Sequence, residues 1–61
     1  MSNKYDQEAV IEILVRRDQL SPELAREMIK QARLEVAEGR DPEEVLYEDF
    51  GLEPDYIWAL I

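Results

Sequence analysis

Three prolines stand in near-identical surroundings and divide the chain into segments. They occur as Ser21-Pro22-Glu23, Asp41-Pro42-Glu43 and Glu53-Pro54-Asp55. Proline is favoured at the first position of a helix, where its missing N–H would have had no partner. A polar capping residue before it and an acid after it complete a helix start. Asp41 and Glu44 also have the spacing of a capping box. The prolines therefore predict helices that begin near residues 22, 42 and 54.

Two glycines and the spacing of apolar residues complete this outline. Gly39 and Gly51 fall where helices should stop, and each suits a left-handed C-cap. We predict helices over residues 6–19, 22–38, 42–50 and 54–61. The fold class is therefore all-α, a compact bundle of two longer and two short helices, with the last pair arranged like a helix-turn-helix. We expect residues 1–61 to form a single small helical domain.

Apolar residues that share a helical face give the candidate core. The predicted core consists of Val10, Ile13, Leu14, Leu24, Met28, Ile29, Ala32, Leu46, Phe50, Ile57, Trp58 and Leu60. Trp58 offers the largest apolar area of this set. Ile11, Val15 and Leu34 lie off these faces, so they are candidate contacts for self-association. A homodimer built on them is a further hypothesis.

Composition excludes several classes of protein. The chain has 61 residues with neither Cys nor His, so it holds no disulfide and no Cys or His zinc site. No apolar run is long enough to span a membrane, and residues 1–6 lack the apolar core of a signal peptide. Without Cys or His the usual catalytic bases and thiol nucleophiles are missing, so we expect no enzyme. We also expect no cofactor, no metal site and a cytoplasmic location.

The net charge of −8 is distributed unevenly. Residues 1–34 carry six acids and six bases, whereas residues 35–61 carry nine acids against Arg40 alone. Acids near helix starts are stabilised by the helix dipole, and surface charge also keeps a protein soluble. An acidic face can equally steer a basic partner into contact, and an extreme form of this is mimicry of the DNA phosphate backbone.

Our leading hypothesis is a small non-enzymatic interaction or regulatory protein whose acidic C-terminal half docks on a basic protein surface. The candidate partner-binding residues are Glu43, Glu44, Tyr47, Glu48, Asp49, Asp55 and Tyr56. Tyrosine is enriched at binding hot spots, so each of the two tyrosines is either a contact residue or half-buried core. We place Phe50 and Trp58 in the core.

The alternative hypothesis is a dimeric, helix-turn-helix-like regulator that associates with DNA. The last helix, residues 54–61, has none of the Arg, Lys, Asn or Gln side chains that contact bases and phosphates. Any DNA contact would therefore come from the neutral half. The candidate bases are Arg16, Arg17, Arg26, Lys30 and Arg33. The acidic net charge opposes binding to nucleic acid and to membranes.

Overall fold

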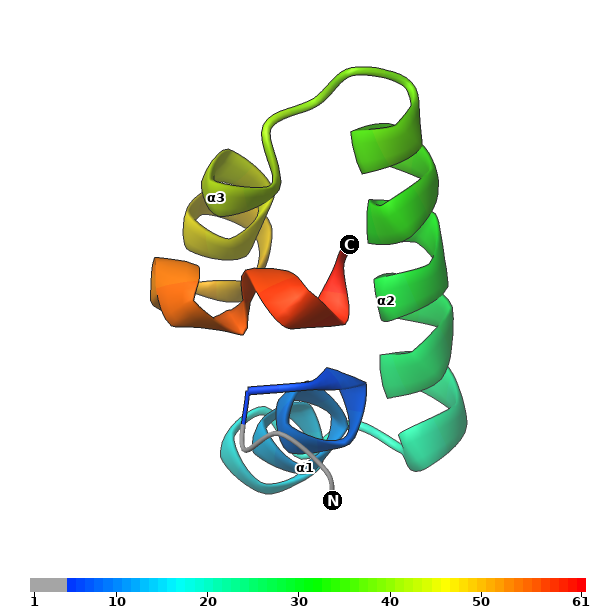
Figure 1. Ribbon diagram of the computed structural model, residues 1–61. Coiled ribbons are helices and arrows are strands. Elements are labelled where there is room, and N and C mark those ends of the chain that lie inside the picture. The colour runs from blue at the N-terminus through cyan, green and yellow to red at the C-terminus, as the bar shows by residue number, and fades with distance from the viewer. Residues whose placement is uncertain (1–4) are drawn as a thin grey trace.

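The computed structural model describes residues 5–61, and it contains helices and no strand over that range. The elements are α1 (Gln7–Arg17), α2 (Pro22–Ala37), α3 (Pro42–Val45), η1 (Leu46–Phe50) and η2 (Pro54–Ala59). Since η1 continues directly from α3, the chain forms two longer and two short helices, which confirms the predicted fold class. In Figure 1, η2 lies between α3 and α1, and α2 stands beside them. Residues 1–4, part of the stretch considered for a signal peptide, lie outside the described residues.

The predicted helix starts at Pro22, Pro42 and Pro54 are confirmed, and the first two have capping hydrogen bonds. Ser21 Oγ accepts from the Leu24 N–H at 3.1 Å, and Asp41 Oδ1 accepts from the Glu43 N–H at 2.9 Å. Asp41 therefore accepts from the N–H of Glu43, the second residue of the helix. The capping-box spacing predicts instead that it accepts from the N–H of Glu44. Glu53 makes no side-chain cap, and η2 is a 3₁₀ helix that follows it.

The predicted helix ends also hold at both glycines. Gly39 and Gly51 have positive φ angles of 113° and 63°. The chain after Gly39 closes α2 with a hydrogen bond from the Arg40 N–H to the Glu35 carbonyl at 3.0 Å, the pattern of a Schellman cap. α1 ends at Arg17 and is followed by the C-cap Asp18 and by Gln19, whose φ of 57° puts a non-glycine residue in the left-handed region. No glycine marks this end in the sequence.

The third helix is wider than expected over its second half. Leu46–Phe50 is a π-helix, in which an N–H donates to the carbonyl five residues earlier, as the Gly51 N–H does to the Leu46 carbonyl. In a regular α-helix Val45 and Phe50 would point about 140° apart. The wider turn brings them closer together, and both are buried with Leu46. Packing of three large side chains into one core thus accompanies the change in helix type.

The buried face of α2 is rotated relative to the prediction. Ala25, Ile29 and Ala32 are buried at helical spacing, whereas Leu24 is 48% exposed and Met28 only half-buried. The prediction that Leu24 belongs to the core is therefore wrong. Small alanines on the inner face allow α2 to approach α1 closely, and this favours the alanine face over the leucine face.

The first helix buries a side chain that we had assigned to a surface stripe. Ile11 belongs to the core together with Val10 and Leu14, while Ile13 is half-buried. Ile11 is therefore mainly a core residue, and its part in self-association stays a prediction. α1 buries apolar side chains on a wide part of its surface, because it packs against both α2 and η2.

The last helix places Trp58 outside the core. Successive residues of a 3₁₀ helix are about 120° apart, so Trp58 of η2 (Pro54–Ala59) lies on the side of Asp55, away from Ile57. Leu60 is buried and Ile57 half-buried, whereas Trp58 and Ile61 are each 60% exposed. The placement of Trp58 in the core is thus wrong. Its place in the core is taken by Val45, Leu52 and Ala59, which we had not predicted.

Candidate functional site

The seven predicted partner-binding residues do not form one site. Glu43 and Asp55 border a hollow beside Trp58, and Glu44 and Tyr47 are exposed. Glu48, Asp49 and Tyr56 are held in contacts within the fold.

Glu48 and Asp49 belong to an ion-pair network around Arg40. Arg40 Nη1 lies 2.6 Å from Glu35 Oε1 and 2.8 Å from Asp49 Oδ2, and Arg40 Nη2 lies 3.4 Å from Glu48 Oε1. Hydrogen bonds to Asp49 and Glu35 raise the pKa of the Arg40 guanidinium. Arg40, the basic residue of the acidic half, therefore links the end of α2 to η1. Two of the predicted docking acids are already committed to this internal contact.

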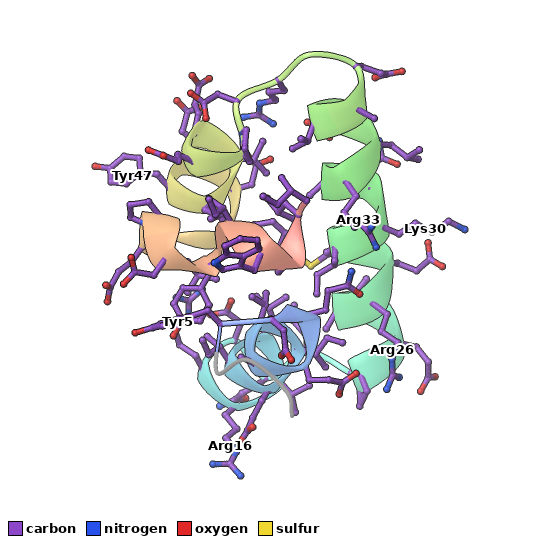
Figure 2. All side chains as sticks on the ribbon, viewed as in Figure 1. Tyr5, Arg16, Arg26, Lys30, Arg33 and Tyr47 are labelled. Atoms are coloured by element: carbon purple, nitrogen blue, oxygen red, sulfur yellow. The ribbon has the colours of Figure 1, made fainter. Side chains whose placement is uncertain are left out.

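The two tyrosines among the candidates differ in environment. The rings of Tyr56 and Tyr5 meet edge to face, with centroids 5.1 Å apart and planes at 83°. Such a pair stabilises η2 against the segment that leads into α1. Tyr47 is 78% exposed and projects from the outer side of the molecule, where Figure 2 labels it. Tyr56 is thus partly a packing residue, and Tyr47 remains open to a partner.

A hollow of about 450 Å³ lies where η2 meets α3, and we call it the Trp58 surface. Its lining residues are Tyr5, Glu43, Pro54, Asp55, Ile57 and Trp58. The indole of Trp58 and the half-buried Ile57 supply apolar area, and the two carboxylates supply charge. The Trp58 surface thus combines an exposed aromatic side chain with acids from two different helices.

The acids of the Trp58 surface have no counter-charge within the described chain. Among residues 5–61, neither Glu43 nor Asp55 takes part in an ion pair. Glu44 and Glu53, close to them in sequence, are also exposed. The surface around the indole is therefore negatively charged and open to solvent.

Comparisons of the chain with family models, curated proteins and solved structures find no match. The assignment of a function therefore depends on the geometry of the surfaces.

Two classes of site have no counterpart in the part of the chain that the structure describes. No group of three or more acidic side chains in residues 5–61 is arranged to hold a metal ion. No helix in that range is both long and apolar enough to cross a membrane.

The five bases of the DNA hypothesis are divided between two surfaces. Arg16 pairs with Glu12 at 3.0 Å. Arg17 donates to the carbonyl of Phe50 at 2.6 Å and is hydrogen-bonded to Asp18. These two arginines are thus engaged with α1 and η1 and do not join the other three, which project from α2 as Figure 2 shows.

Proposed function

We propose that this chain is a non-enzymatic interaction protein whose acidic C-terminal half docks on a basic surface of a partner protein. The observation that carries the proposal is the exposure of Trp58, 60% of whose surface is open to solvent between the carboxylates of Glu43 and Asp55.

An exposed tryptophan is the strongest single argument for docking at this surface. Burying an aromatic side chain is strongly favourable, so a partner that covers the exposed indole gains binding free energy. Tryptophan is enriched among the residues that dominate protein–protein binding. The acids around it match the arrangement of such interfaces, in which a polar rim surrounds an apolar anchor.

The chemistry of the Trp58 surface selects a basic partner. Lys and Arg side chains combine an aliphatic stem with a cationic head. The head can lie over the indole face or against Glu43 and Asp55, and the stem can cover Ile57. Uncompensated acids also accelerate the encounter with a positively charged surface. A partner segment with bases flanking an apolar residue fits both properties.

The geometry changes which acids should be reversed in a test. Reversing Glu48 or Asp49 would also break an ion pair with Arg40, in the network that links α2 to η1, so loss of binding would have two explanations. Glu43→Lys with Asp55→Lys changes the surface without touching that network. Glu23→Lys with Glu27→Lys on α2 is a matched control, because Glu23 follows Pro22 as Glu43 follows Pro42.

The experiment is a pull-down from cell lysate at low salt with a salt-step elution, on four tagged chains. We expect wild type and the α2 control to retain the same basic protein. We expect Glu43→Lys/Asp55→Lys and Trp58→Ala to lose it, and that protein to elute as salt rises. Equal retention by all four chains would overturn the proposal.

DNA association remains the alternative prediction and has less support from the geometry. Of its five bases only the three on α2 are free of internal partners in residues 5–61. A gel shift at low salt with micromolar protein tests it, and the absence of a shifted band would remove it.

A further inference from the structure

A second hollow lies between α1 and α2, and its charged lining is mainly basic, whereas that of the Trp58 surface is acidic. Its volume is about 450 Å³, and we call it the α1–α2 groove. Ile11 and Ile29 form part of its apolar lining, and Leu34, which is 52% exposed, stands at its edge. An exposed leucine beside two core isoleucines marks a strip of apolar surface that a partner could cover.

Three bases line this groove. Arg26, Lys30 and Arg33 follow one another at helical spacing along about 10 Å of α2. None of the three makes an ion pair or a hydrogen bond within residues 5–61, and Glu8 of α1 is the one acid that shares the groove with them. The groove is therefore locally positive although the chain carries a net charge of −8.

We infer that the α1–α2 groove receives the Trp58 surface of a second copy of this chain. The inference rests on the proposed function, since it names one partner for the same acidic surface. The argument is complementarity: one surface offers an exposed indole flanked by Glu43 and Asp55. The other offers exposed Leu34 flanked by Lys30 and Arg33. Within residues 5–61, neither surface has an ion-pair partner of its own for the charges that the other would contact.

The positions of the two surfaces dictate the kind of assembly. In Figure 2 the labelled bases Arg26, Lys30 and Arg33 lie on α2 at the right of the view. Tyr5, which borders the Trp58 surface, and Tyr47 lie at the left. A contact between unlike surfaces on different sides is head-to-tail, and each added copy leaves one surface of each kind open. The assembly therefore grows beyond a dimer as concentration rises.

Sedimentation velocity on pure protein tests the inference with a charge swap. The groove variant is Lys30→Glu/Arg33→Glu, and the surface variant is Glu43→Lys/Asp55→Lys. Each variant alone places like charges opposite one another, so we expect about tenfold weaker association than wild type, from two ion pairs of ~0.2–1 kcal/mol each. A 1:1 mixture again places opposite charges together, and we expect association to return.

The mixture separates local complementarity from total charge. Both variants keep a net negative charge, so overall repulsion predicts no association between them. Recovery in the mixture therefore supports the inference, and absence of recovery overturns it. Wild type that stays monomeric at millimolar concentration overturns it without any variant. Lys30→Gln/Arg33→Gln serves if the groove variant fails to fold, and unchanged association of that chain would contradict the inference.

Failure here is distinguishable from failure of the proposed function. A monomeric chain that still captures a basic protein through Glu43, Asp55 and Trp58 would reject the second copy and retain the docking surface. Self-association through these surfaces without capture of a basic protein would retain the second copy as the occupant and reject docking on another protein.

Discussion

Arg17 donates a hydrogen bond of 2.6 Å to the carbonyl oxygen of Phe50, 33 residues further along the chain. Its second terminal nitrogen lies 3.4 Å from the Gly51 carbonyl, and Asp18 accepts from the same guanidinium at 2.9 and 3.0 Å. The end of α1 thus satisfies carbonyl groups at the end of η1, where a helix leaves its last acceptors unpaired. The contact joins the neutral and acidic halves of the molecule.

Removing this contact should destabilise the fold measurably. We expect Arg17→Met to lower the free energy of unfolding by about 1 kcal/mol, the value for one hydrogen bond, because solvent screens the partly exposed guanidinium. Urea denaturation followed by circular dichroism measures it. Arg16→Met is the neighbouring control, since its exposed pair with Glu12 should contribute under about 0.5 kcal/mol. Equal effects of the two variants would contradict this role of Arg17.

The Asp18 carboxylate predicts a specific pH dependence. A hydrogen bond from Arg17 lowers the pKa of Asp18 below its ordinary value of 3.8. A carboxyl whose pKa is lower in the folded chain stabilises the fold fully at pH values above its unfolded pKa. This contribution is lost as pH falls through the folded pKa. We expect the difference in Tm between wild type and Asp18→Asn to be full near neutral pH and to close below pH 3.8. A difference that persists unchanged in strong acid would be inconsistent with this.

The Arg40 network predicts a salt-dependent loss of stability. Arg40→Gln removes the shared partner of Glu35 and Asp49 and leaves three acids close together. We expect a lower Tm, and a smaller decrease at high salt because exposed charges are screened. Arg33→Gln, a base without an internal partner in residues 5–61, is the control and should leave Tm nearly unchanged. The comparison uses thermal unfolding at low and high salt, and a salt-independent decrease would argue against an electrostatic origin.

Burial predicts opposite outcomes for two leucines, Leu46 of η1 and Leu24 of α2. Leu46 is fully buried, so Leu46→Ala should cost about 2–5 kcal/mol. A domain of this length has a total stability of only ~3–9 kcal/mol, so this variant should be largely unfolded at moderate temperature. Leu24→Ala, at the half-exposed position, should cost under about 1 kcal/mol. Chemical denaturation of both chains measures this, and a large loss for Leu24→Ala would restore the original core assignment.

The helix starts were predictable because the interactions that set them are local. A cap such as Ser21, a proline and the N–H it satisfies all lie within four residues, so sequence spacing contains the whole interaction. The same holds at Gly51, where only the residue's own φ matters. The end of α1 was predicted within two residues by the apolar spacing, but the left-handed conformation of Gln19 was not, because it depends on packing and not on the residue type.

The candidate site was less predictable because it depends on how the last helix docks and on distant pairs. Trp58 lies about 100° from Ile57 around an α-helix and about 120° around a 3₁₀ helix, so the two side chains point in different directions in either case. Docking against the rest of the fold, and not local sequence, decides which side of so short a helix faces the core. Arg40 likewise selects Glu48 and Asp49 from a different helix, which no spacing rule indicates. Glu43 and Asp55 were identified by charge, but the aromatic residue between them was assigned to the core.

The most direct test of the account is fluorescence quenching of Trp58 by ions of opposite sign. The chain contains a single tryptophan, so its emission reports this site alone. A negative surface concentrates cations and repels anions. We therefore predict that the ratio of Cs⁺ quenching to iodide quenching, each normalised to free tryptophan, is above one in wild type and falls in Glu43→Lys/Asp55→Lys. Weak quenching by both ions would place Trp58 in the core, and a ratio that the charge reversal leaves unchanged would show that Glu43 and Asp55 do not set the charge around Trp58.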